Sequence, residues 1–225
     1  MTTRHVTREQ TIRVPVEAGH IDGDLIVPDG AHRVVLFAHG SGSSRHSSRN
    51  RYVAEELNTA RLATLLIDLL TSEEEEVDLR TRRLRFDIPL LARRLLHAVD
   101  WLRANESTAG LRIGCFGAST GGGAALVAAA DRPDDIIAVV SRGGRPDLAA
   151  EALSRVRAPT LLIVGGNDGP VIGMNRTAMA QMQAPVQLEI VPGASHLFEE
   201  PGKLERVAAL ARDWFVRHLG GTSTR

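Results

Sequence analysis

Cysteine and aromatic residues are scarce in this sequence of 225 residues. Its single cysteine, Cys115, has no partner for a disulfide within the chain, and because it lies in a predicted buried strand we expect an inert thiol in the core. Five Phe, two Trp and one Tyr are its only aromatic residues, which gives no sign of a large pocket for a long hydrocarbon chain. The composition therefore argues against a disulfide scaffold, a reactive thiol and a lipid-sized ligand.

An excess of charge of either sign and a long apolar run are also missing. Lys plus Arg and Asp plus Glu both total 27, so the formal net charge is zero and we expect no nucleic acid as a partner. No apolar run reaches about 18 residues, and the first residues contain no apolar segment of a signal peptide, so we expect a soluble, cytoplasmic protein without membrane contact. The length fits a single domain over residues 1–225 with a core at about 12–219, present as a monomer or homodimer.

The order of apolar and amphipathic segments predicts an α/β fold. Two short alternating runs, at 11–16 and 20–27, predict an antiparallel hairpin at the edge of the sheet. After residue 34, apolar strands alternate with longer helical segments, which is typical of a mostly parallel sheet of about eight strands with helices on both faces. The further strands are expected at 34–38, 63–67, 112–116, 136–140, 160–164 and 186–191, and the helices at 47–60, 88–103, 122–130, 148–156, 171–182 and 204–219.

The strongest chemical signal is the turn Gly117-Ala118-Ser119-Thr120-Gly121, which joins a predicted strand to an Ala-rich predicted helix. A serine at the apex of so sharp a turn exposes its hydroxyl, and the turn requires small residues two positions to either side. Gly117 and Gly121 meet that requirement. The turn predicts Ser119 as a nucleophile and the N–H of Thr120 as a donor to an oxyanion, although Gly and Ser also cluster in ordinary turns.

Two later strands each end beside a residue that can assist such a serine. The strand at 160–164 is followed by Asp168, and the strand at 186–191 is followed by His196. Because the carboxyl ends of parallel strands meet at one edge of a sheet, we expect Ser119, Asp168 and His196 to form a nucleophile, acid and base set. Asp147 is the alternative acid, one strand earlier, and its other interpretation is a cap of the helix that follows it.

The first parallel strand ends in a glycine-rich turn, His39-Gly40-Ser41-Gly42. A dinucleotide-binding fingerprint starting there would need glycine at the position of Arg45, and no Gly-Lys-Ser or Gly-Lys-Thr sequence exists for a P-loop, so we expect no cofactor. The N–H of Ser41 is the predicted second oxyanion donor, and His39 is predicted to brace the loop rather than to catalyse. Four adjacent glutamates at 73–76, in a loop expected at 69–85, do not converge on one ion, so they predict a solvated surface and not a metal site.

Over about residues 12–219 the chain resembles the α/β-hydrolases, and among them the dienelactone hydrolase-like proteins, which have no large cap domain. The resemblance is carried by the motifs at 39–42, 117–121, 166–168 and 193–196. The stretches 41–50 and 141–147 are similar to bacterial dienelactone hydrolase-like domains, some of which are joined to a phosphoribosyltransferase domain. Dienelactone hydrolase itself uses a cysteine nucleophile, whereas the residue at the turn here is Ser119, which puts the dienelactone substrate in doubt.

The resemblance implies an α/β-hydrolase fold and a serine hydrolase that cleaves small esters or lactones. In that mechanism His196, oriented by Asp168, takes the proton of Ser119, and the N–H groups of Ser41 and Thr120 hold the oxyanion. The same residues would serve an acyltransferase, an amidase or a peptidase, because all of these share an acyl-enzyme. A non-catalytic binding protein is the remaining alternative, although a scaffold needs none of the three side chains.

Four arginines near the strand ends bear on the substrate. Arg142 and Arg145 follow one strand, and Arg45 and Arg49 lie in or just after the glycine-rich turn. Because arginine binds carboxylates through a bidentate fork, Arg45 and Arg142 are candidate contacts to a small anionic ester or lactone. The other interpretation pairs these arginines with acidic residues of the chain, namely Asp147, Asp87 and the run 73–76.

Overall fold

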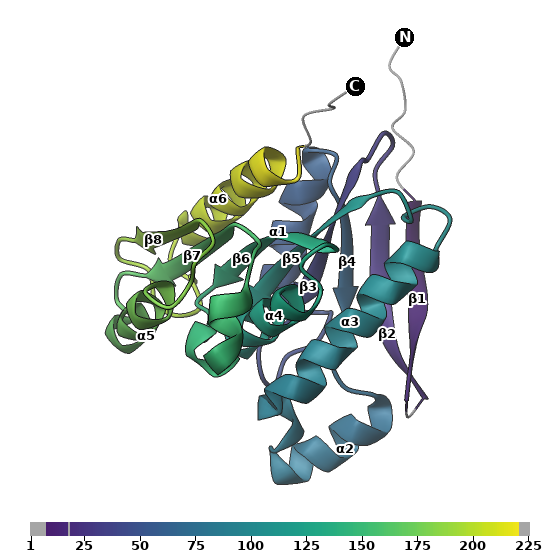
Figure 1. Ribbon diagram of the computed structural model, residues 1–225, viewed down its shortest axis with the longest axis horizontal. Coiled ribbons are helices and arrows are strands. Elements are labelled where there is room, and N and C mark those ends of the chain that lie inside the picture. Colours follow the sequence, from purple (N-terminus) through teal and green to yellow (C-terminus); the bar gives the residue numbers. More distant parts are fainter. Residues whose placement is uncertain (1–7, 18, 221–225) are drawn as a thin grey trace.

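The computed structural model describes residues 8–17 and 19–220. Its centre is an eight-stranded sheet in the order β1-β2-β4-β3-β5-β6-β7-β8 (Figure 1). The hairpin β1–β2 is antiparallel and joins β4 in antiparallel fashion, and every other neighbouring pair is parallel. The strands are β1 (Arg8–Val16), β2 (Gly19–Val27), β3 (Arg33–Ala38), β4 (Ala63–Ile67), β5 (Arg112–Ala118), β6 (Ile136–Arg142), β7 (Thr160–Gly165) and β8 (Val186–Val191). The predicted edge hairpin and mostly parallel sheet are confirmed.

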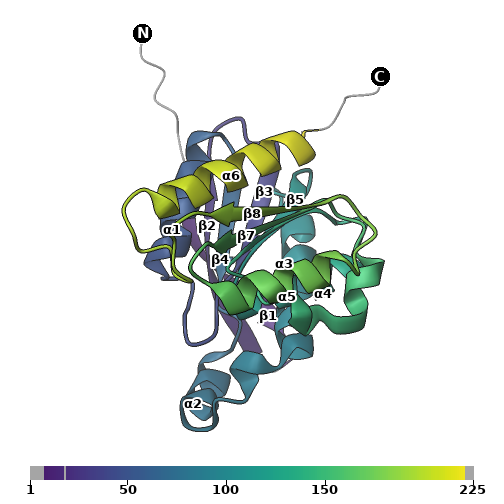
Figure 2. The same ribbon diagram turned by 90° about the vertical axis from the view of Figure 1, so that its left-hand side faces the viewer.

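Helices cover both faces of this sheet (Figures 1 and 2). The helices are α1 (Ser48–Thr59), α2 (Ser72–Thr81), α3 (Ile88–Ala104), α4 (Thr120–Asp131), α5 (Gly169–Met179) and α6 (Lys203–His218), with 3-10 segments η1 (Leu84–Phe86) and η2 (Pro146–Arg155). α1 packs with α6 on one face, and α3, α4 and η2 pack on the other. Alternate residues of β3 therefore enter different cores: Phe37 joins the cluster under α1 and α6, and Leu36 joins the cluster under α3 and α4.

The segment 69–85 was expected as a loop, and that prediction is wrong. It forms α2, which projects beyond the end of the sheet in both views (Figures 1 and 2), followed by η1. Thr71 and Glu74 form a capping box at the start of α2, which satisfies N–H groups that a helix end leaves free. Glu74 also accepts a hydrogen bond from the buried Arg94 of α3 at 2.5 Å, so part of the acidic run has a structural role.

The helix expected at 148–156 is also different in the structure. Residues 146–155 form the 3-10 segment η2, which is interrupted at Ala150, where φ is 45° and ψ is −124°. Such backbone values do not continue a right-handed helix. The sequence pattern identified the amphipathic segment but not its broken geometry.

Candidate active site

Ser119 stands at the turn between β5 and α4, with φ 50° and ψ −121°. That backbone conformation is unusual for a side chain other than glycine, and it is the strain expected of an exposed nucleophile. Gly117 and Gly121 make the turn possible because each lacks a Cβ where other backbone atoms come close. A Cβ on Gly117 would lie 2.5 Å from the carbonyl oxygen of Gly121, and a Cβ on Gly121 would lie 2.5 Å from the carbonyl oxygens of Ala38 and His39.

Asp168 and His196 meet at the carboxyl ends of β7 and β8. His196 Nδ1 lies 2.6 Å from Asp168 Oδ2, so the ring donates its Nδ1 hydrogen to the carboxylate and Nε2 is left as the acceptor. Backbone bonds tie the two loops together, because Gly166 N donates to Val191 O at 2.8 Å and Asn167 N donates to Ala194 O at 2.9 Å. The predicted acid and base are therefore brought into contact.

A pocket of about 260 Å³ holds both Ser119 and His196 in its wall. Its lining residues are Gly40, Ser41, Ser43, Ser47, Arg49, Ala118, Ser119, Arg142, His196 and Leu197. Ser41 contributes from the glycine-rich turn, and Thr120 is the first residue of α4, where an N–H has no partner inside the helix. Neither N–H donates a hydrogen bond to another group among residues 8–17 and 19–220, so both predicted oxyanion donors are free.

Asp147, the alternative acid, is not part of this arrangement. Its carboxylate accepts from Arg145 Nε at 2.8 Å and from Arg145 Nη2 at 2.7 Å. This pair also removes Arg145 from the arginines that were candidates to border the site. Asp168 is the carboxylate that contacts the histidine.

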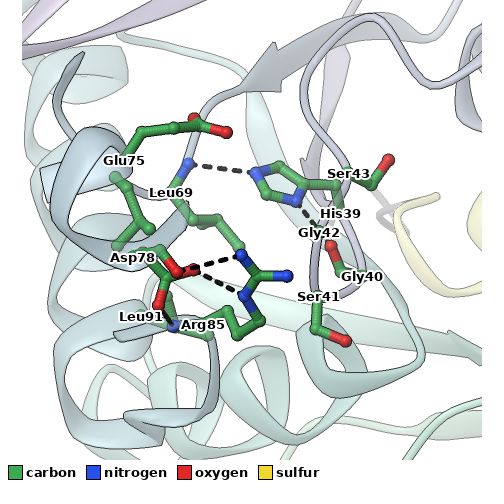
Figure 3. A pocket seen from close by; sticks show the side chains of 11 residues that line it. His39, Gly40, Ser41, Gly42, Ser43, Leu69, Glu75, Asp78, Arg85 and Leu91 are labelled. Atoms are coloured by element: carbon green, nitrogen blue, oxygen red, sulfur yellow. Dashed lines mark hydrogen bonds and ion pairs between the residues drawn. The ribbon is translucent and has the colours of Figure 1, made fainter. Parts of the chain in front are cut away.

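A second, smaller pocket shares Gly40, Ser41 and Ser43 with the first. Figure 3 shows the residues that line this second pocket. There His39 Nδ1 donates to Gly40 O at 2.8 Å, and His39 Nε2 accepts from Leu69 N at 3.2 Å. Burial lowers the pKa of His39, which keeps the ring neutral and suits this pair of bonds. Arg85 donates through Nε to Asp78 at 2.5 Å on the opposite wall. His39 thus braces the turn against the segment that follows β4, as predicted.

Arg45 does not border the pocket that contains Ser119. Its Nη1 hydrogen-bonds to Asp68 Oδ2, and its Nε lies 3.6 Å from Asp24 Oδ2. Its backbone N–H also donates to Asp68 Oδ1 at 2.8 Å. The prediction of Arg45 as a substrate contact is wrong, because carboxylates from β2 and from the end of β4 already neutralise its guanidinium.

Arg142 is the last residue of β6 and lines the pocket that contains Ser119. It is only 6% exposed, its Nη2 donates to Asn50 Oδ1 at 3.4 Å, and its Nε and Nη1 are buried without a protein partner. Burial, aided by the nearby charge of Arg49, lowers the pKa of Arg142 to about 10. Of the two arginines predicted as substrate contacts, Arg142 is the one that reaches the site.

Asn50 contacts the site through Arg142, and no motif in the sequence gave it a role. It is buried in α1 on the same helical face as Val53, Ala54 and Leu57. The signal was in the sequence, since a polar residue occupies the first position of an i, i+3, i+4, i+7 apolar pattern. Its oxygen faces Arg142 from 92 positions away in the chain.

The described residues also bear on membrane spans, on metal ligands and on the state of Cys115. No helix among them is both long and apolar enough to cross a membrane. Within the same residues no three His, Cys, Asp or Glu side chains gather as ligands for a metal. Cys115 is fully buried in β5, and burial raises the pKa of its thiol to about 12, which agrees with an inert core residue.

The chain is similar to known proteins over nearly its whole length. The crystal structure of dienelactone hydrolase from Anabaena variabilis ATCC 29413 is 63% identical in sequence and has a TM-score of 0.94 over 96% of this chain and all of that one. Est1E from Butyrivibrio proteoclasticus shares the fold at 16% identity, with a TM-score of 0.78 over 93% of this chain and 98% of its own.

A relative from Mycobacterium tuberculosis (strain ATCC 25618 / H37Rv), named "Putative phosphoribosyl transferase Rv0571c", is 57% identical over 214 residues. Those residues are 95% of this chain but 47% of that protein, so the chain spans about half the length of the relative. The transferase name therefore describes a protein about twice as long.

Residues 21–218 match the Dienelactone hydrolase family. That match covers most of the chain, and it agrees with the superposition on a solved dienelactone hydrolase and with the arrangement of the sheet and helices. The chain belongs to the dienelactone hydrolase family and has the α/β-hydrolase fold.

Proposed function

We propose that the chain is a serine hydrolase that cleaves small carboxylic esters or lactones. The observation that carries this proposal is that Ser119, at its strained turn, and His196, bonded to Asp168, line one pocket. A structural turn would need neither a positive φ at a serine nor a histidine–carboxylate pair across the same cavity. The size of the pocket, about 260 Å³, favours a small substrate.

The proposed chemistry gives each of these groups a defined role. His196 Nε2 takes the proton of Ser119 as its oxygen attacks the carbonyl carbon, and Asp168 stabilises the imidazolium that forms. The N–H groups of Ser41 and Thr120 donate to the oxyanion of the tetrahedral intermediate. The alcohol leaves with the proton from His196, and water then attacks the acyl-enzyme with the same histidine as base. The bond between Ser119 and the acyl group breaks as Ser119 takes the proton back from His196, and the carboxylic acid is released.

Labelling with a fluorophosphonate probe tests the nucleophile directly. Wild-type protein should be modified on the peptide that contains Ser119, and Ser119→Ala should remain folded but unlabelled and inactive on short 4-nitrophenyl esters. Ser41→Ala is the matched control, because its proposed role rests on the backbone N–H and the variant should keep both labelling and turnover. A folded wild-type protein that is not labelled would favour a binding protein of this fold instead.

The acid is tested by comparing two carboxylates. Asp168→Asn should lower kcat by about 10⁴, as in other triads whose histidine loses its orienting carboxylate, whereas Asp147→Asn should have little effect because Asp147 is bound to Arg145. A larger loss in Asp147→Asn, with both proteins folded, would reverse the assignment. Matched ester and amide substrates, with and without an added alcohol acceptor, separate an esterase from an amidase or an acyltransferase.

A further inference from the structure

The guanidinium of Arg142 is a buried cation without a counter-ion. Its single hydrogen bond, to Asn50, is long at 3.4 Å, and two of its nitrogen groups have no partner. Burying an unpaired charge costs several kcal/mol, so proteins rarely retain one without a use for it. The neutral amide of Asn50 orients the guanidinium but supplies no negative charge.

Among the described residues, one other arginine is buried and two that are partly buried also lie close to the glycine-rich turn or α2, and all three are paired with carboxylates. Arg94, which is 2% exposed, donates to Glu17 at 2.7 Å and to Glu74 at 2.5 Å. Arg85 donates to Asp78, and Arg45 is surrounded by three carboxylates. The chain therefore neutralises arginines that it uses structurally, and Arg142 departs from that pattern inside the pocket that contains Ser119.

Two further positive groups face the same pocket. Arg49 lines it with a buried, unpartnered Nε, and its Nη1 lies 3.3 Å from Glu199, whose side chain is 63% exposed. A pair that is this exposed neutralises little charge. The first turn of α1 borders the pocket, since Ser47 and Arg49 line it and the turn contains no acidic residue. The Ser47 hydroxyl accepts from Asn50 N at 3.4 Å, which leaves the N–H groups of Ser48 and Arg49. Helix N-termini attract anions through their free N–H groups and the helix dipole.

We propose that Arg142, Arg49 and the first turn of α1 bind a phosphate group carried by the substrate, beside the bond that Ser119 attacks. This inference rests on the proposed function, because it assigns a second group on the substrate of the same pocket. A carboxylate would neutralise one of the two guanidiniums, whereas a phosphate monoester has a charge close to −2 at neutral pH and three accepting oxygens. The site thus fits a small phosphorylated ester or lactone.

The binding test does not depend on turnover. Inorganic phosphate is titrated calorimetrically into wild-type protein, with acetate and sodium chloride at matched ionic strength as the comparison ions. Phosphate should bind at least about ten-fold more tightly than acetate, and Arg142→Met should weaken phosphate binding at least about ten-fold. Arg49→Met should weaken it several-fold, and Arg51→Met, which removes an exposed charge from the same helix outside the pocket, should not.

The kinetic test uses 4-nitrophenyl esters whose six-carbon acyl chains end in a methyl, a carboxylate or a phosphonate group. The ratio of kcat/KM for the phosphonate ester to that for the methyl ester should be well above one in wild type and should fall toward one in Arg142→Met. Equal phosphate binding by wild type and Arg142→Met, or acetate binding as tight as phosphate binding, would overturn the inference. If Ser119 is labelled and phosphate does not bind, only this inference fails. If phosphate binds and Ser119 is not labelled, the hydrolase proposal fails, and with it the assignment of the phosphate to a substrate, while the anion-binding site itself stands.

Discussion

Replacing Arg142 by methionine should make the protein more stable. Burial lowers the pKa of Arg142 from its usual value above 12 to about 10. Each pKa unit corresponds to about 1.4 kcal/mol, so the charged side chain destabilises the folded state by about 3 kcal/mol. The pKa of this cation is lowered on folding, so the cost is present in full at pH 7 and falls only as the pH rises through about 10.

The net gain is smaller than that cost because the substitution also removes a contact. Losing the hydrogen bond to Asn50 and leaving its oxygen unsatisfied costs about 1–2 kcal/mol. Arg142→Met should therefore be more stable by about 1–2 kcal/mol, which for a chain of this size raises Tm by roughly 3–6 °C. Equilibrium urea unfolding followed by circular dichroism, in a buffer without phosphate or sulfate, measures the difference.

Arg94→Met is the matched control, because Arg94 is also buried but is bonded to Glu17 and Glu74. Its removal should destabilise the protein by about 2 kcal/mol, since both carboxylates lose a charged donor and α2 loses its contact with α3. The same replacement of arginine by methionine is therefore expected to raise stability at position 142 and to lower it at position 94. A loss of stability above about 1 kcal/mol in Arg142→Met would refute the reasoning, because it would make Arg142 a structural residue.

Three further predictions concern the turn at Ser119 and the buried His39. Ser119→Gly should be about 1 kcal/mol more stable than Ser119→Ala in urea unfolding, because φ 50° is strained for alanine but not for glycine; equal stabilities would argue against strain. Gly121→Ala should cost several kcal/mol and abolish fluorophosphonate labelling, whereas Gly173→Ala, a helical position with open space around it, should stabilise by about 0.5–1 kcal/mol. Because the pKa of His39 is lowered by burial, the free energy of unfolding should fall as the pH drops below about 6.5. His39→Gln should make this fall shallower between pH 7 and 5, although not remove it, because the pKa of His218 is also lowered. An unchanged pH dependence in His39→Gln would refute the prediction.

The parts of the site that follow from local chemistry could be predicted from the sequence. The turn at Ser119 is specified by glycines two positions to either side, and Asp168 and His196 each follow a strand of the same parallel sheet. Strand ends meet at one edge whatever the packing details, so the order of these residues along the chain was enough to expect Asp168 and His196 in contact. The extents of most strands also agree to within about two residues, because apolar runs and Gly or Pro boundaries are local signals.

The helix α2 was not predicted, because the local sequence pattern did not indicate it. Four adjacent glutamates suggested a solvated loop, but Glu74 completes a capping box with Thr71 and pairs with Arg94, which is 20 positions further along the chain. The capping box was visible in the sequence, and the contact with the buried Arg94 of α3 was not. Helices gain most of their stability from such tertiary contacts, so a short polar one is easily missed.

The sequence by itself determined the sheet, the turn at Ser119 and the residues available to serve it, because these depend on periodicity and on small residues at fixed spacing. Only the tertiary structure decided which arginines are neutralised. Arg45 and Arg142 were equivalent as candidates, yet Arg45 meets Asp68 and Asp24, while Arg142 meets the neutral Asn50 across 92 positions. A charge has the same sequence signature whether it is paired or free, and its free energy is set by burial and by the distance to the nearest opposite charge, which exist only once the chain has folded.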